Sequence, residues 1–338
     1  MKKLKRRNVI CLIVELVLIF IITGADCNSP TTNNQNNSSI DYRQAMRDFV
    51  VMISANAKQE NSNFIITPQN GQEIITADGE SDGSPAVDYL NAIDGVGRED
   101  LWYGYDEDDQ PTPGSESNYM AEFLDLAESE NSQVLVTDYC STQTFVDDSY
   151  KKNQSKGYIS FAADRRELDN IPVYPAEPYN GNQNNIQTLE DASNFLYLIN
   201  PQQYNTKTDF LNALRNTNFD LLIIDLFFND NTELTQTDIN SLKIKTGGGS
   251  RLVVAYMSIG EAETYRYYWQ TEWENNPPVW LEEENPNWPG NYKVRYWDPG
   301  WQEIIFGNNE AYLTKIIDAD FDGIYLDIID AFEYFEDL

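Results

Sequence analysis

The chain has 338 residues, 41% of them hydrophobic, which is enough to bury the core of one large α/β domain. It has no histidine and only three cysteines, which excludes Ser-His-Asp and Cys-His nucleophiles, HExxH metal sites and four-cysteine zinc sites. The formal net charge of −32 excludes nucleic acid as an expected partner, because its binding depends on Lys and Arg at the phosphates.

Residues 1–27 have the order of a secretory signal, with a basic run, an apolar run over 9–23 and then small residues. The apolar run contains Glu15 and is shorter than the roughly 20 residues that span a bilayer, which favours a cleaved signal. Cys27 resembles the acceptor cysteine of bacterial lipoproteins, although Asp26 stands where that pattern has a small residue. The alternative is cleavage before Asp26 and a free Cys27. We expect an extracellular or cell-surface protein that meets the membrane only through this segment.

Residues 28–40 (NSPTTNNQNNSSI) have almost no apolar content and predict a disordered tether. The structured chain is expected to begin with a helix over 41–58, where apolar residues recur at helical spacing from Met46 to Ala57. Strand and helix patterns then alternate. We expect strands at 63–71, 133–139 and 157–163, helices at 118–129 and 143–156, and a further segment at 92–104.

A second polar stretch, residues 178–187, predicts a linker between the halves 41–177 and 188–338 of a single domain. The alternation then resumes. We expect strands at 195–199, 221–225, 252–261 and 323–330, an extended segment at 292–298, and helices at 208–216, 237–244 and 309–320. Strands that alternate with helices indicate a parallel sheet, and eight or nine strands in one domain favour a (β/α)8 TIM-type barrel of the α/β class.

Carboxylates stand at the end of one apolar run after another in this chain. They are Asp225, Glu261, Glu263, Asp327, Asp330, Asp138, Glu99 and Asp100. In a (β/α)8 barrel the carboxyl ends of the strands converge on the face that carries the active site. Because two acids suffice to hydrolyse a glycosidic bond, a ring of carboxylates without any histidine favours glycoside chemistry.

Three long segments are similar to a known family. AYMSIGEAETYRYYW (255–269), WLEEENPNWPGNYKVRYWDPGWQEIIF (280–306) and FDGIYLDIIDAFEYF (321–335) resemble exported glycoside hydrolases related to endo-α-1,4-polygalactosaminidase, glycoside hydrolase family 114. NFIITPQNGQE, AIDGVGREDLWYG and VLVTDYC resemble later blocks of the same family. The resemblance implies a (β/α)8 barrel that hydrolyses an amino-sugar polymer.

The order of these blocks differs from that of the family, in which the last three follow the YLDIID block instead of preceding it. The sequence therefore resembles a circularly permuted member, whose linker 178–187 joins the old ends and whose segments near Asp41 and Leu338 are neighbours. The alternatives are a fragment of a tandem array and a misplaced gene boundary.

The resemblance implies a catalytic pair at two strand ends, for which we expect Glu261 and Asp327, with Asp225 facing the same mouth. The alternative for each member of the pair is a structural salt bridge with Arg266 or Arg295, and for Asp225 the capping of the following loop. The expected substrate-binding residues are Gln69, Asn70, Glu99, Asp138, Tyr256, Glu263, Arg266, Trp297 and Asp330. The tryptophans of 269–301 suit stacking on sugar rings, with packing of their own loop as the alternative. We expect no metal and no cofactor.

The expected function is hydrolysis of an amino-sugar polysaccharide by an exported enzyme. An acidic surface attracts a cationic polymer, although it also simply keeps an exported protein soluble. The alternatives are a carbohydrate-binding barrel without catalysis and a cell-surface protein that only recognises partners.

Overall fold

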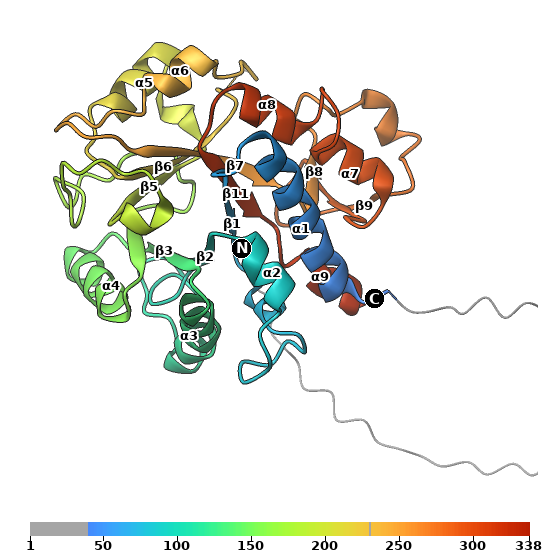
Figure 1. Cartoon of the computed structure of the whole chain (residues 1–338), viewed down its shortest axis with the longest axis horizontal. Coiled ribbons are helices and arrows are strands. Elements are labelled where there is room, and N and C mark those ends of the chain that lie inside the picture. The colour runs from blue at the N-terminus through green and yellow to red at the C-terminus, as the bar shows by residue number, and fades with distance from the viewer. Residues whose placement is uncertain (1–39, 230) are drawn as a thin grey trace, which may run out of the picture.

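The computed structural model describes residues 40–229 and 231–338, which form an α/β fold (Figure 1). The expected signal over 1–27 and the tether up to residue 39 lie outside the described residues. No helix of the described segments is long and apolar enough to cross a membrane.

The strands form two parallel sheets and one antiparallel sheet. The five-stranded parallel sheet has the order β1 (Ile65–Pro68), β11 (Gly323–Asp327), β7 (Leu252–Ser258), β6 (Leu221–Asp225) and β5 (Phe195–Leu198). The three-stranded parallel sheet has the order β2 (Gly95–Glu99), β3 (Gln133–Tyr139) and β4 (Ile159–Ala163). The antiparallel sheet has the order β8 (Glu261–Glu263), β10 (Asn291–Val294) and β9 (Leu281–Glu284).

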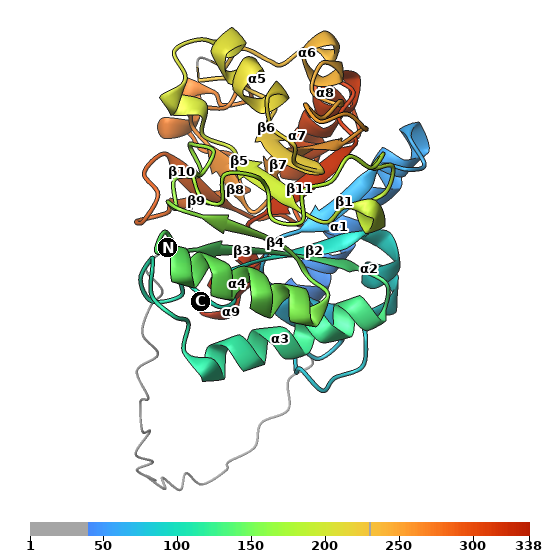
Figure 2. The same cartoon turned by 90° about the vertical axis from the view of Figure 1, so that its left-hand side faces the viewer.

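Helices connect and cover the parallel strands, and α3 and α4 lie outside β2, β3 and β4 (Figure 2). The α-helices are α1 (Tyr42–Glu60), α2 (Val87–Ala92), α3 (Gly114–Ser129), α4 (Gln143–Lys156), α5 (Lys207–Arg215), α6 (Gln236–Asn240), α7 (Pro299–Ile305), α8 (Tyr312–Asp318) and α9 (Ala331–Glu336). Short 3-10 turns lie at Gln72–Ile75, Leu189–Asp191, Pro201–Gln203 and Thr271–Glu274. The strand and helix alternation expected from the sequence is confirmed for both halves of the described chain.

Helix α1 shows why its sequence folds as it does. Asp41 is the N-cap, and its side chain accepts a hydrogen bond from the backbone N–H of Gln44. Phe49, Val50 and Ile53 recur at helical spacing and are fully buried, so this face of the helix belongs to the hydrophobic core.

Among the described residues, backbone hydrogen bonds between strands join the two parallel sheets at β1 and β2. Between β1 and β2, Gln69 bridges Gly97, and the N–H of Asp94 donates to the carbonyl of Ile66 at 2.8 Å. Between β4 and β5 no ladder exists among the described residues, and the two strands meet through side chains such as Phe161 and Phe195, 5.8 Å apart. The connection 164–194 also lacks an α-helix. The described strands therefore confirm the expected α/β class with parallel sheets, and they show no continuous hydrogen-bonded ladder through all eight parallel strands.

The segments at the two ends of the described chain are neighbours. β1 pairs in parallel with β11, and Arg43 of α1 forms a salt bridge of 2.9 Å with Glu336 of α9. The rings of Tyr42 and Phe335 lie 5.5 Å apart. Figure 1 shows α1 beside α9 accordingly, and the expected proximity of these two segments is confirmed.

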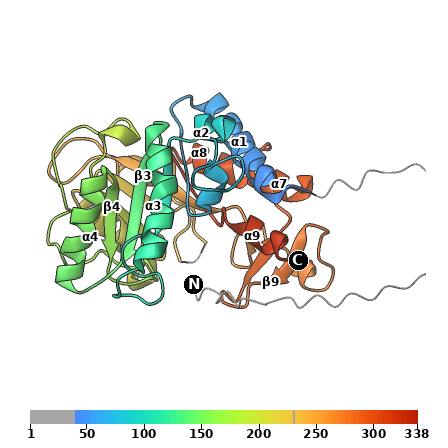
Figure 3. The same ribbon diagram turned by 90° about the horizontal axis from the view of Figure 1, so that it is seen from below.

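The strand expected over 252–261 is interrupted. β7 ends at Ser258, and the chain turns before β8 begins at Glu261. β8 pairs with β10. The extended segment expected at 292–298 is thus observed as the shorter strand β10, Asn291–Val294. This antiparallel sheet, together with α9, lies on the opposite side of the molecule from α3 and α4 (Figure 3).

Candidate active site

The carboxyl ends of four neighbouring strands, β7, β11, β1 and β2, bring polar side chains together. Asp327 ends β11, Glu99 ends β2, and Gln69 follows β1 directly. β1 lies between β11 and β2, so Gln69 stands between the two acids. We call Glu99 and Asp327 the acid pair.

One amide nitrogen holds both members of the acid pair. Gln69 Nε2 donates to Glu99 Oε2 at 3.1 Å and to Asp327 Oδ1 at 3.0 Å. Because both oxygens accept from the same nitrogen, they lie within about 6 Å of each other. Gln69 is itself only 1% exposed, so the amide is fixed by its surroundings.

Each acid also accepts hydrogen bonds from its own set of donors. Asn70 Nδ2 donates to Glu99 Oε2 at 2.9 Å, and the Tyr139 hydroxyl donates to Glu99 Oε1. The Tyr256 hydroxyl donates to Asp327 Oδ2 at 2.8 Å. Each carboxylate therefore turns one oxygen toward the Gln69 amide and the other toward a tyrosine hydroxyl.

Burial and mutual repulsion favour a proton on the acid pair. Burial raises the pKa of Glu99, and the neighbouring Asp100 charge raises it further. Burial first and the Glu99 charge second raise the pKa of Asp327 to about 8, although the Tyr256 hydrogen bond opposes the shift. Two close carboxyl groups resist simultaneous ionisation, so the acid pair retains one proton near neutral pH.

Asp225, an expected catalytic acid, lies in a separate group with Arg266 and Glu263. Arg266 contacts Asp225 at 2.8 Å and Glu263 at 2.5 Å, and the Tyr265 hydroxyl donates to Glu263 at 2.6 Å. Burial raises the pKa of Asp225 and the Arg266 charge opposes this. Asp225 also accepts a hydrogen bond from the backbone N–H of Phe227 at 2.8 Å, which fits the alternative that it caps the following loop. Glu263 and Arg266, which were expected to bind substrate, form an ion pair with each other, and Arg266 also pairs with Asp225.

Glu261, which was expected to pair with Asp327, has its own hydrogen-bond partners in the antiparallel sheet. Glu261 accepts from Asn285 Nδ2 at 2.7 Å and from Asn291 Nδ2 at 3.2 Å, with Lys293 Nζ at 3.9 Å. The physical reason is the break after β7, because β8 pairs with β10 and carries Glu261 into the antiparallel sheet. Glu99 takes its place beside Asp327.

Asp138 is also corrected, because its carboxylate faces α4 and not the acid pair. It is fully buried and accepts from the backbone N–H of Trp102 at 2.8 Å and from Ser149 Oγ at 2.6 Å. Side chains alternate along a strand, so Asp138 and Tyr139 of β3 point to opposite faces. Tyr139 is the one that reaches Glu99.

Two other expected binding residues lie near α9. The Trp297 ring packs between the Tyr42 ring, with centroids 5.1 Å apart, and the Phe335 ring, with centroids 4.6 Å apart, so it fills the junction of α1 and α9. Asp330 precedes α9 as its N-cap residue, and its charge contributes to the raised pKa of Asp327. Asp330 therefore supports the acid pair through its charge.

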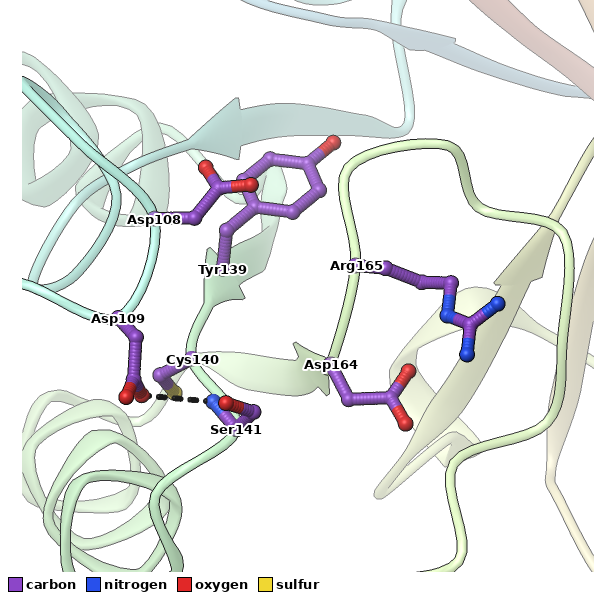
Figure 4. A pocket seen from close by; sticks show the side chains of 7 residues that line it. All are labelled: Asp108, Asp109, Tyr139, Cys140, Ser141, Asp164 and Arg165. Atoms are coloured by element: carbon purple, nitrogen blue, oxygen red, sulfur yellow. Dashed lines mark hydrogen bonds between the residues drawn. The ribbon is translucent and has the colours of Figure 1, made fainter.

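A small cavity of about 30 Å³ lies beside Tyr139 (Figure 4). Its lining residues are Asp108, Asp109, Tyr139, Cys140, Ser141, Asp164 and Arg165. Asp109 accepts from the backbone N–H of Ser141 at 2.8 Å, so this loop is fixed at the end of β3. Within the described segments, no group of three or more His, Cys, Asp or Glu residues could hold a metal ion.

Sequence reasoning placed Glu99 and Asp327 at strand ends but did not pair them, and it passed over Tyr139 and Arg166. Two-residue alternation was the available signal for Tyr139, because residues 135, 137 and 139 share one face of β3. Arg166 follows β4 in irregular chain and offers no such periodic signal.

Comparison with known proteins shows where this chain is related to others. Residues 176–338 match the model of the glycoside-hydrolase family GH114. An uncharacterized protein of Methanocaldococcus jannaschii is 41% identical over 181 residues, which make up 52% of this chain and 49% of that protein. Uncharacterized proteins of Thermotoga maritima and Deinococcus radiodurans are 45% and 41% identical over 36% of this chain, and the matches cover 36% and 37% of those proteins. The chain thus spans about half or less of the curated relatives it matches. Over residues 176–338, this chain is therefore similar to the glycoside-hydrolase family GH114.

Proposed function

We propose that this protein is a retaining glycoside hydrolase in which Glu99 and Asp327 are the catalytic carboxyl groups. The observation that carries the proposal is the single Gln69 nitrogen that donates to both acids, at 3.1 and 3.0 Å. Retaining enzymes keep their carboxyl groups about 5–5.5 Å apart, whereas inverting enzymes need about 6.5–9.5 Å for an intervening water. A bridge through one nitrogen supports the shorter separation.

The proposed reaction has two steps. In the first, one carboxylate attacks the anomeric carbon while the other carboxyl group protonates the leaving glycosidic oxygen, which gives a covalent glycosyl-enzyme ester. In the second, the group that lost its proton removes one from water, and the water oxygen attacks the same carbon and releases the first carboxylate. The reaction requires one proton on the resting acid pair, which agrees with the raised pKa of both acids.

The proposed substrate is an amino-sugar polysaccharide. The net charge of −32 attracts a polymer that carries free amino groups, and the GH114 match supports a polysaccharide. The order of residues 1–27 supports export, with the protein secreted or held at the cell surface through Cys27. No nucleic-acid partner is proposed.

We also propose that the eight parallel strands make a circularly permuted (β/α)8 barrel. GH114 is a family of TIM barrels, and its match covers β5, β6, β7 and β11, whereas β1 to β4 precede it in this chain. Each parallel strand lies beside the next one in chain order, and the pairing of β1 with β11 brings the first strand to the last. The salt bridge from α1 to α9 supports the same order.

Carboxamide substitutions suit the test, because both fit the hydrogen bonds of the native acids. In Glu99→Gln and Asp327→Asn the amide oxygen would still accept from Gln69. The new NH2 group would face the hydroxyl of Tyr139 or Tyr256, which rotates to accept. Loss of turnover in these variants would therefore report chemistry and not misfolding.

The experiment measures reducing ends released from α-1,4-polygalactosamine, its N-acetylated form and chitosan. We expect Glu99→Gln and Asp327→Asn each to lose about 100-fold or more in turnover while binding of the polymer persists. The matched control is Glu261→Gln, which should stay within about tenfold of the native protein. Near-native turnover in either acid-pair variant contradicts the assignment. Polymer binding without any turnover by the native protein would favour a carbohydrate-binding barrel instead.

A further inference from the structure

The guanidinium group of Arg166 contacts two neighbours of Glu99 at once. We propose that Arg166 is a positioning residue for the acid pair and acts on Glu99 through Tyr139 and Asp100. This inference rests on the proposed function, because it gives Arg166 a part in the same reaction. Arg166 comes from the irregular chain after β4, outside the segment that matches the family.

The contacts of Arg166 fix it firmly. Nη2 lies 2.7 Å from Asp100 Oδ1, and Nη1 lies 3.3 Å from Asp100 Oδ2, a two-pronged contact. Nη2 also lies 2.7 Å from Asp108 Oδ1 and donates to the carbonyl of Gly104 at 2.8 Å. The side chain is 22% exposed, so these charges are partly withdrawn from solvent.

The same guanidinium lies over the Tyr139 ring, with Cζ 3.9 Å from the ring centroid. This is a close cation–π contact, and Tyr139 is only 1% exposed. Gly104 adopts φ +110°, and a Cβ there would lie 3.0 Å from both Arg166 Nη2 and Tyr139 Cβ. Glycine at this turn thus lets the arginine and the ring meet, and the fixed ring aims its hydroxyl at Glu99.

The positive charge of Arg166 also acts directly on the pKa of Glu99. The titratable groups that act on Glu99 or respond to it are Asp100 of the β2 end, Tyr139 of β3, Tyr197 of β5, Asp327 and Tyr325 of β11, and Arg166. Burial raises the pKa of Glu99 most, Asp100 raises it further, and Arg166 lowers it. Asp100 and Arg166 therefore shift the pKa of Glu99 in opposite directions, and each shift partly offsets the other.

These opposite signs give a test that a purely structural role would fail. The variants are Arg166→Gln, Asp100→Asn and the double variant, and Asn suits residue 100 because it tolerates the left-handed φ of 62° found there. The readout is the carbon-13 NMR titration of the Glu99 carboxyl group, assigned by its disappearance in Glu99→Gln. The matched control is Arg165→Gln, whose side chain is 46% exposed and pairs with Asp169 at 3.4 Å.

We expect Arg166→Gln to raise the pKa of Glu99, Asp100→Asn to lower it, and the double variant to return it close to the native value. Arg165→Gln should leave it unchanged. The pH profile of kcat should move in the same directions, and Arg166→Gln should lower kcat about tenfold with KM nearly constant. Arg166→Lys, which keeps the charge, should keep the Glu99 titration even if Arg166→Gln does not fold.

An unchanged Glu99 titration in Arg166→Gln, or shifts of the same sign in Arg166→Gln and Asp100→Asn, would overturn the inference. A titration that moves without any change in kcat or its pH profile would overturn the positioning role. The NMR titration needs no turnover. Absence of hydrolysis by the native protein therefore counts against the proposed function, while the titration independently decides whether Arg166 acts on Glu99.

Discussion

At the scale of single residues, the acid pair is a site whose charge opposes folding. Asp327 has a pKa of about 8 in the folded protein, mainly because of burial, against an ordinary value near 3.9 in an unfolded chain. Between these two pH values the folded protein binds more protons than the unfolded chain. The free energy of unfolding therefore falls as the pH rises from about 4 to about 8.

The first prediction follows from this sign. Asp327→Asn removes the group whose ionisation is disfavoured, so its Tm should exceed the native Tm at pH 8, and the difference should shrink toward pH 5. Each kcal/mol relieved corresponds to roughly 2–4 °C in a domain of this size. Scanning calorimetry at pH 8 and pH 5 measures the Tm difference between the variant and the native protein. A difference that is smaller at pH 8 than at pH 5 would contradict the assignment of the raised pKa.

Individual acids could be predicted from the sequence, but their pairing could not. Asp327 and Glu99 were both recognisable as carboxylates that end apolar runs. Which acids meet depends on which strands are neighbours. Gln69 and Asp327 are 258 residues apart in the sequence and come together only because β1 pairs with β11. Glu261 seemed equivalent to them because nothing in SIGEAE reveals that β7 ends at Ser258.

At the scale of elements, the two-residue alternation of strands separates site residues from structural ones. On β3, Asp138 binds the helix layer while Tyr139 binds Glu99. The sequence supports both orientations equally, since each residue follows the apolar run QVLV. Only the packing of α4, which brings Ser149 and Asn153 to Asp138, decides between them.

The second prediction concerns this helix-facing acid. Asp138→Ala would leave the backbone N–H of Trp102 and the hydroxyl of Ser149 without their buried acceptor. Each buried donor left unpaired costs about 1–3 kcal/mol, so urea unfolding should show a loss of about 2–6 kcal/mol. The turnover of the fraction that remains folded should be close to native. Normal stability with abolished turnover would instead return Asp138 to the active site.

The third prediction concerns the interior between β2 and β11. A Cβ on Gly97 would collide with the hydroxyl of the fully buried Tyr325, so Gly97→Ala should lower the free energy of unfolding by about 1–3 kcal/mol. Gly114→Ala is the control, because a Cβ there meets nothing within 4 Å. Equal unfolding midpoints for the two variants would show that β2 and β11 are not packed this closely.

At the scale of the whole molecule, the two ends of the described chain lie close together, an arrangement that favours tolerance of circular permutation. The side chains of Arg43 and Glu336 meet, with Nε and Oε1 2.9 Å apart. A few residues could therefore join the two ends of segment 41–338. The polar stretch 178–187 lies outside every helix and strand. The alternation of most strands and helices was predictable, whereas the missing ladder between β4 and β5 was not, because it depends on how the irregular chain 164–194 packs.

The fourth prediction tests this order. A variant that opens between residues 180 and 181 and joins residue 338 to residue 41 through a short Gly/Ser linker should fold, with a Tm within a few degrees of the native value. Opening the chain between residues 222 and 223, inside β6, is the control and should abolish folding. Aggregation of the first variant under conditions where the native protein is soluble would count against circular permutation.

The central claim is that two carboxyl groups held by one amide hydrolyse a glycoside with retention. The most direct measurement is proton NMR of the anomer that forms first when the native protein cleaves α-1,4-polygalactosamine, recorded before mutarotation. A first product with the α configuration is the result that the acid pair predicts, because two displacements at the same carbon restore the original configuration. A first product with the β configuration would contradict it, because inversion needs a water between acids that stand farther apart than Gln69 allows.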